Sequence, residues 1–170
     1  MNFSESLILT TSRSLRLPSA LTGCGSKTAA PETSVEPTQQ TAPYQQEQSQ
    51  TEKALALINT FATGDTDTAR SLLSDGYIQH NLAYGTGADA FIGSVEYLAS
   101  ADVKTTVNNI RAFEDGDKVF LQTIYNFAGA GEQVAFDIFR FDEDGKIAEH
   151  WDVMETIADQ STWQNQNGKF

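Results

Sequence analysis

The chain has 170 residues and a mass of 18.6 kDa, enough for one domain with a tail but not for two ordinary domains. Eleven basic residues against 23 acidic ones give a net charge of −12, which argues against nucleic acid or anionic lipid as the main partner. Cys24 is the single cysteine, so no disulfide forms within the chain, and with two histidines it cannot complete a four-ligand zinc site without carboxylates.

The N-terminal third of the chain differs in composition from the rest. All four prolines lie in the first 43 residues, whereas 15 of the 17 aromatic residues follow residue 50. Residues 25–50 are rich in Thr, Pro, Ala and Gln, so they cannot bury enough apolar surface to offset the entropy lost on ordering. We therefore expect a disordered linker at 25–50 and a folded domain at 51–170.

Residues 1–24, before the linker, are a candidate lipoprotein signal segment. The sequence Leu21-Thr22-Gly23-Cys24 resembles the lipobox of bacterial lipoproteins, which implies lipidation of Cys24 and anchoring in the cell envelope. Against this, the longest apolar run, Leu7-Ile8-Leu9, is shorter than the roughly 7–15 residues of a signal peptide. The alternative is a disordered N-terminus with an incidental cysteine in a cytoplasmic protein. No stretch approaches the roughly 20 apolar residues of a spanning helix, so only the lipid anchor would reach a membrane.

Helical periodicity predicts three helices at the start of the folded domain. Thr51 can cap the first, in which apolar residues recur at helical spacing until Gly64 ends it. Two shorter helices are predicted at about 67–73 and 89–98. Between them, the segment from Tyr77 to Leu82 is predicted to be irregular or extended.

After residue 101 the apolar pattern changes from a helical period to alternation. Four runs rich in β-branched and aromatic residues follow, at 103–113, 118–128, 133–141 and 146–154. Connections such as Asp115-Gly116 and Asp144-Gly145 are typical of hairpins, so the runs predict an antiparallel meander. Helices followed by an antiparallel sheet predict an α+β fold, in which a curved, cone-shaped sheet packed against N-terminal helices encloses a pocket for a small apolar ligand.

Asp137 is the first candidate for chemistry, because it interrupts an apolar strand where a carboxylate is unusual. A buried carboxylate suits general acid–base work; the alternative is a solvent-facing residue or a partner of Arg140. His150 and Asp152 lie two apart on the last strand and share a face, whereas Trp151 points to the other. An even-numbered connection places Asp137 opposite His150 or Asp152, and a three-residue loop with a glycine bulge would pair it with Trp151.

His80 is a further catalytic candidate, since it precedes a glycine-bearing loop, and loops at the mouth of a cavity often supply such groups. The alternative is a histidine that satisfies local backbone groups. A metal centre of His80, His150 and either Asp152 or Asp137 can be written down, but no ligand-spacing motif supports it, so neither a metal nor a cofactor is predicted. The candidate ligand contacts are Tyr77, Gln122, Tyr125, Phe139 and Trp151.

Several segments together resemble SnoaL-like proteins of the nuclear transport factor 2-like superfamily. They are Tyr77-Ile78-Gln79-His80-Asn81, Phe136-Asp137-Ile138-Phe139-Arg140-Phe141, Asp144-Gly145-Lys146-Ile147 and Glu149-His150-Trp151-Asp152-Val153. The resemblance extends from about Thr51 to the end of the chain and implies the cone fold. Many relatives are homodimers whose sheets pack through their outer faces, so the resemblance also implies a homodimer here. For Asp137 it implies the acid–base role that polyketide cyclases of this family use in an intramolecular aldol condensation. In related limonene epoxide hydrolases, an aspartate near the position of Asp152 points into the cavity.

Two classes of function stay open at this point. In the enzyme hypothesis, Asp137 abstracts or relays a proton next to a carbonyl group, and His150 or His80 holds or protonates the developing oxyanion. In the binding hypothesis, the same cavity holds a small apolar ligand, or the domain serves as a dimerisation module. The side chains expected to point outward would form an apolar patch that needs cover, as in a homodimer. They are Val134, Phe136, Ile138 and Trp151.

Overall fold

A computed structural model of the chain describes residues 48–170, which belong to one compact unit. The predicted signal segment, the lipidation site at Cys24 and nearly all of the predicted linker lie outside the described residues. Within the described residues, none of the helices has both the length and the apolar character needed to span a bilayer.

The first helix, α1 (Gln50–Thr63), begins slightly earlier than predicted. Its N-cap is Ser49 rather than Thr51, because Ser49 and Glu52 form a capping box with distances of 2.8 and 3.1 Å. The helix ends at Gly64, as the sequence predicts. Gly64 has a φ of 75°, in the left-handed region, and a Cβ there would lie 2.8 Å from that of Ala99.

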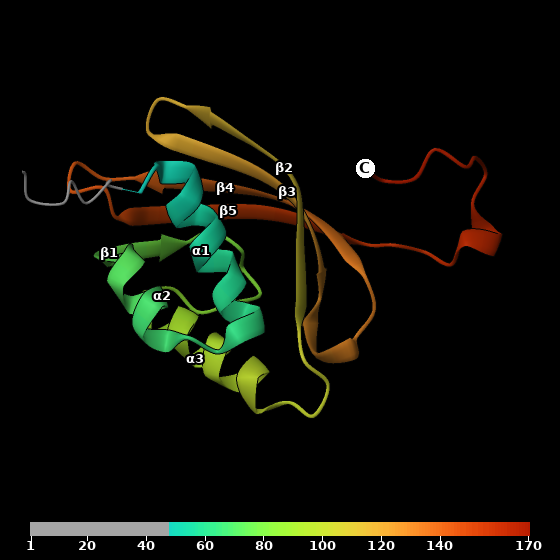
Figure 1. Cartoon of the computed structure of the whole chain (residues 1–170), viewed down its shortest axis with the longest axis horizontal. Coiled ribbons are helices and arrows are strands. Elements are labelled where there is room, and N and C mark those ends of the chain that lie inside the picture. The colour runs from blue at the N-terminus through green and yellow to red at the C-terminus, as the bar shows by residue number, and fades with distance from the viewer. Residues whose placement is uncertain (1–47) are drawn as a thin grey trace, which may run out of the picture. The chain divides into compact units, whose positions relative to one another are not determined.

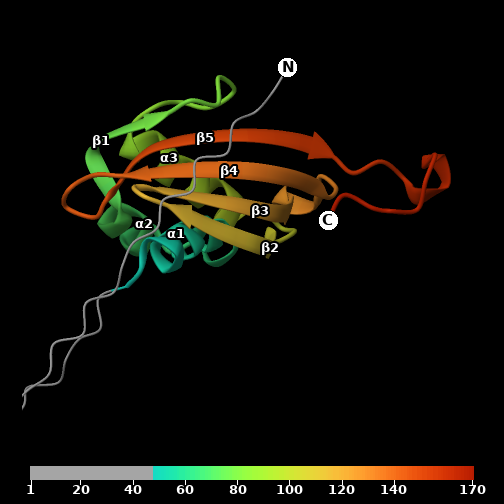
Figure 2. The same ribbon diagram turned by 90° about the horizontal axis from the view of Figure 1, so that it is seen from above.

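The helices and strands that follow agree with the sequence pattern except at one edge. Their bounds are α2 (Thr66–Leu72), β1 (Leu73–Gln79), α3 (Ala88–Ser100), β2 (Thr106–Asp115), β3 (Lys118–Asn126), β4 (Gln133–Phe141) and β5 (Ile147–Thr156). The sheet order is β1-β5-β4-β3-β2, which Figure 2 shows from above. Strands β2 to β5 form the predicted antiparallel meander. The sequence predicts an irregular or extended segment from Tyr77 to Leu82, and its first residues belong to the strand β1. This strand pairs in parallel with β5, so the sheet is mixed.

The three α-helices lie on one side of the curved sheet, and the core lies between these two layers (Figure 1). Residues of β4 alternate: Ala135, Asp137 and Phe139 face the helices, whereas Phe136 and Ile138 face away. Register shifts in the β2–β3 and β4–β5 pairs mark bulges, which bend strands. The predicted α+β fold, a cone-shaped sheet closed on one side by N-terminal helices, is confirmed.

Candidate functional site

A cavity of about 580 Å³ lies between the sheet and the helices. This volume falls within the range of roughly 300–1,000 Å³ that is typical of small-molecule pockets. Its wall is largely apolar and includes Phe61, Phe91, Leu98, Phe127 and Met154. The polar side chains in the wall include Tyr77, Gln79, Asp137, His150 and Asp152, and within the described residues no lysine or arginine lines the cavity.

The register of the β4–β5 hairpin brings three of the candidate residues together. Asp137 pairs with Asp152 across the hairpin, and His150, two residues before Asp152, lies on the same face. Of the arrangements that the sequence left open, the structure therefore has the pairing with Asp152. A bulge decides it, since Phe141 pairs with Ile147 but the preceding Arg140 pairs with Glu149.

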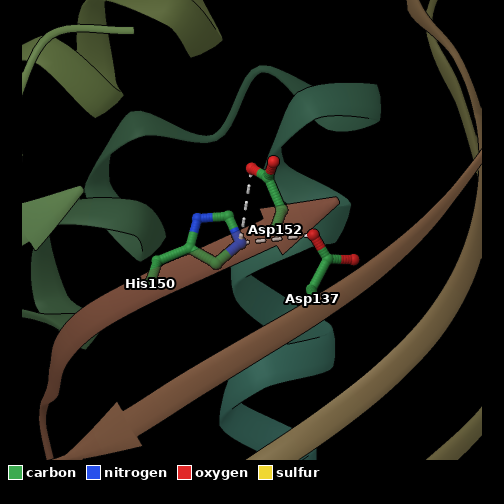
Figure 3. Close-up of side chains that lie close together, drawn as sticks. All are labelled: Asp137, His150 and Asp152. Carbon is green, nitrogen blue, oxygen red and sulfur yellow. Dashed lines mark hydrogen bonds and ion pairs between the residues drawn. The ribbon is translucent and has the colours of Figure 1, made fainter. Parts of the chain in front are cut away.

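One nitrogen of the His150 imidazole, Nε2, faces both carboxylates, as Figure 3 shows. His150 Nε2 is 3.2 Å from Oδ1 of Asp137 and 3.9 Å from Oδ2 of Asp152. The side chains of Asp137, His150 and Asp152 are only 4%, 7% and 6% exposed. Such a buried cluster interacts more strongly than the same groups would in water, because the surrounding protein screens charge weakly.

Tyr125 completes the hydrogen bonding of Asp137. Its hydroxyl donates to Oδ2 of Asp137 at 3.0 Å. Burial, reinforced by the charge of Asp137, raises the pKa of Tyr125 well above its usual value, so the phenol keeps its proton and Asp137 is the acceptor. With His150 near Oδ1 and Tyr125 near Oδ2, each oxygen of Asp137 has a polar neighbour that fixes its orientation.

Asp152 and Tyr77 lie in the same polar part of the wall. Burial raises the pKa of Asp152, the charge of Asp137 adds to this effect, and His150 and Asn81 oppose it. Asp152 is therefore protonated at higher pH than an ordinary aspartate. The hydroxyl of Tyr77 is buried and has no hydrogen-bond partner among the described residues. Burial, followed by the charges of Asp152 and Asp137, also raises the pKa of Tyr77 far above its usual value.

The end of β1 supplies two site residues that sequence reasoning did not single out, Gln79 and Asn81. Gln79 Nε2 lies 3.0 Å from Nδ1 of His150, and Asn81 Nδ2 donates to Oδ1 of Asp152 at 2.6 Å. Gln79 could have been found, since it lies two residues after Tyr77 in an extended segment and therefore shares its face. Asn81 carried no such signal, because it follows the strand.

Three sequence-predicted residues lie on the outer side of the sheet, away from the cavity. His80 stacks on Trp151, with ring centroids 4.4 Å apart, and its Nε2 lies 2.9 Å from Glu149, so both rings face the outer side of the sheet. Gln122 is also on that side, where its amide donates to the backbone oxygen of Lys169. The expected catalytic His80 and the expected ligand contacts Gln122 and Trp151 are therefore turned away from this cavity. Alternation along β3 and β5 turns Gln122 and Trp151 outward, and His80, just after the end of β1, stacks on Trp151.

The other predicted contacts are on the inner side. Tyr77 and Tyr125 line the cavity. Phe139 is fully buried behind His150, with the two rings stacked 4.3 Å apart, so it supports the histidine instead of forming the wall. The metal centre that would include His80 is not formed. Asp137, His150 and Asp152, by contrast, offer ligand atoms that all lie within 4.8 Å of one another.

Comparison with known proteins finds a matching family model and structures with a similar fold. The model of a family described as the SnoaL-like domain matches residues 54–150. A nuclear transport factor 2-like protein of unknown function from Cytophaga hutchinsonii has a similar structure, with 16% identity, a TM-score of 0.56, and coverage of 65% of this chain and 94% of its own. IdmH from Streptomyces antibioticus, whose assignment as a polyketide cyclase is provisional, has 18% identity, a TM-score of 0.52 and coverage of 64% and 93%. An LEH-like epoxide hydrolase from M. tuberculosis has 18% identity, a TM-score of 0.53 and coverage of 61% and 80%. No curated protein matches the chain.

Proposed function

Because the chain belongs to the SnoaL-like domain family, we propose that its cavity catalyses acid–base chemistry on a small, neutral, apolar compound that carries a carbonyl group. The reaction is of the aldol-condensation, isomerase or lyase type. One observation carries the proposal: the Asp137 carboxylate is buried in the wall of an apolar cavity, next to a second carboxyl whose pKa is raised. Two carboxyl groups with different environments can divide the roles of base and acid between them.

The roles follow from the hydrogen bonds of each group. Asp137 takes a proton from the carbon next to the carbonyl group, so the substrate becomes an enolate. The protonated Asp137 exchanges with solvent and returns a proton to the product. Asp152 holds or protonates the oxygen that gains negative charge, since its raised pKa makes the protonated form more available. His150 and Tyr125 orient the Asp137 carboxylate, each at one of its oxygens.

The charge of the cavity supports a neutral substrate. Two carboxyl groups line it, and no lysine or arginine among the described residues is present in its wall to bind an anion. A substrate with its own carboxylate or phosphate would lose its hydration without gaining an opposite charge, which is costly. The aromatic and aliphatic wall suits an apolar body of one to a few rings.

An exchange assay tests the proposal without knowledge of the final product. Acetophenones, indanones, tetralones and anthrones are incubated with the protein in deuterated buffer, and loss of the proton next to the carbonyl is followed by proton NMR. We expect the wild type to accelerate exchange for at least one ketone. Asp137→Asn should lower the rate by about 10²–10⁴-fold, the usual contribution of a general base, while ketone binding persists. Asp144→Asn, the same change at an exposed residue of the β4–β5 connection, should leave the rate unchanged.

The binding-module hypothesis is the second candidate, and the size and apolar wall of the cavity favour it equally. If the wild type never exceeds background exchange while a ketone binds in the cavity, the enzyme proposal is wrong and the binding module replaces it. If exchange is catalysed but Asp137→Asn retains it, a base other than Asp137 does the chemistry.

We propose further that two copies of the chain pack through the outer face of the sheet. Four side chains there, Phe113, Phe120, Phe136 and Val153, are 40–72% exposed and lie in adjoining register rows with Ile138 and Trp151. An apolar area of this kind is unusual on a monomer and favours a partner. Val134, expected in this patch, is on the same face but is already buried. Light scattering tests the proposal, and a monomer at micromolar concentration would contradict it.

A further inference from the structure

The side-chain amide of Gln79 has only one orientation that satisfies its neighbours. The backbone N–H of Asn81 donates to Oε1 of Gln79 at 3.0 Å. A backbone N–H can only donate, so the oxygen of the amide must face Asn81 and the nitrogen must face Nδ1 of His150, 3.0 Å away. The reversed amide would turn its own NH₂ group, a donor, against the N–H of Asn81 and leave both donors without an acceptor.

The amide of Asn81 is fixed in the same way. The backbone N–H of Ala83 donates to Oδ1 of Asn81 at 2.9 Å, so Nδ2 of Asn81 is the group that meets Asp152. The segment itself is held to the strand beside it and to the loop that follows. The N–H of His80 donates to the backbone oxygen of His150 at 2.9 Å, and the N–H of Gln79 donates to Thr86 at 3.2 Å. These bonds keep both amides in place.

The protonation of His150 follows from this arrangement. A neutral imidazole carries its single N–H on one of two nitrogens, and the other nitrogen is an acceptor. Since the Gln79 amide donates to Nδ1, the proton of neutral His150 is on Nε2, where it points to Oδ1 of Asp137 at 3.2 Å. We infer that Gln79 is a positioning residue that holds His150 as the Nε2–H tautomer, so that His150 donates to Asp137 and cannot itself act as the base.

The last part of this inference rests on the proposed function, since it leaves Asp137 as the group that accepts the substrate's proton. The tautomer also bears on the metal set of Asp137, His150 and Asp152. A metal ion needs a nitrogen with a free lone pair, but Nε2 carries the proton and Nδ1 faces the Gln79 amide. The donor set therefore suits hydrogen bonding better than metal ligation.

Nitrogen-15 NMR of the histidine rings tests the inference on the full chain without substrate. The chain has two histidines, and a His80→Gln variant assigns their signals. In the wild type at neutral pH, we expect His150 to show a protonated Nε2 and an unprotonated Nδ1. A protonated Nδ1 with a bare Nε2 would overturn the inference, as would a doubly protonated ring.

Gln79→Glu then tests whether Gln79 is the cause. One carboxylate oxygen can still accept from Asn81, while the other now accepts from Nδ1, so the single proton of the neutral His150 ring should move from Nε2 to Nδ1 in most molecules. Gln164→Glu, the same change at an exposed residue of the C-terminal tail, should leave the His150 ring unchanged. The His80 signals should stay the same in both variants. If Gln79→Glu retains the wild-type tautomer, Gln79 does not set it.

The two proposals can fail separately. In the exchange assay, Gln79→Glu should lower the rate by at least tenfold with little change in ketone affinity, because the acceptor Asp137 loses its donor. If the wild-type ring is the Nε2–H tautomer and no ketone exchanges, the assignment of His150 stands and the proposed function fails. If exchange is catalysed but Nδ1 is the protonated nitrogen, the function stands and the role of Gln79 is wrong.

Discussion

Two tyrosines in the cavity wall offer a matched test of the hydrogen-bond network. Tyr77 and Tyr125 are both almost completely buried, but the Tyr125 hydroxyl donates to Asp137 at 3.0 Å, whereas the Tyr77 hydroxyl has no partner among the described residues. Replacement by phenylalanine removes one oxygen from each and leaves the ring. The same chemical change should therefore alter the free energy of unfolding in opposite directions.

The magnitudes follow from the cost of burying polar groups. An unpaired buried hydroxyl costs about 1–3 kcal/mol, and the small void left by its removal takes back part of this, so Tyr77→Phe should stabilise the fold by about 1 kcal/mol. Tyr125→Phe removes a hydrogen bond to a charged group, worth about 1.5–3 kcal/mol, and leaves an oxygen of Asp137 without its donor. For a domain of this size, about 1 kcal/mol corresponds to a shift in Tm of about 4 °C.

Urea unfolding followed by tryptophan fluorescence measures both variants, since Trp151 lies in β5 and Trp163 in the C-terminal tail. All samples are compared at one protein concentration, because dimerisation would couple stability to concentration. A loss of stability in Tyr77→Phe as large as that in Tyr125→Phe would show that the Tyr77 hydroxyl has a partner. The description of this wall as a network with one unpaired group would then be wrong.

Three further perturbations test other parts of the structure. Asp152 has a raised pKa in the fold, so the folded state binds more protons than the unfolded chain, and the stability of the fold falls as pH rises above the ordinary pKa of 3.8. Asp152→Asn should therefore be more stable than the wild type toward neutral pH in urea titrations. At lower pH, the stabilities of the variant and the wild type should agree. Gly64→Ala should cost at least about 1–2 kcal/mol because of its left-handed backbone, whereas Gly93→Ala, with open space in α3, should stabilise by up to about 1 kcal/mol in the same assay. If the chain forms the proposed dimer, Phe136→Lys should convert it to a folded monomer in light scattering, while Leu82→Lys, at a fully exposed loop residue, should not. A dimer in both variants would place the interface elsewhere.

Local pattern was sufficient for the helices, for the antiparallel strands and for which residues of one strand share a face. The sequence predicted both ends of α1 to within two residues: the helix ends at Gly64, as predicted, and its N-cap is Ser49 instead of Thr51. Alternation in 146–154 put His150 and Asp152 on one side of the last strand, and they are there, whereas the sequence left open whether Asp137 joins them. These features depend on backbone conformation over a few residues, and the period of a strand or helix records that conformation in the sequence.

Contacts between distant segments decided the rest. Gln79 and Asn81 are 71 residues from their partners His150 and Asp152, and they reach them only because β1 returns alongside β5. A bulge in the β4–β5 pair set which residue opposes Asp137, and the same parallel pairing turned His80 outward onto Trp151. The sequence by itself determined which side chains share a face of each strand. Only the tertiary structure determined which strands meet and in what register, because those choices depend on the packing of the whole sheet against its helices.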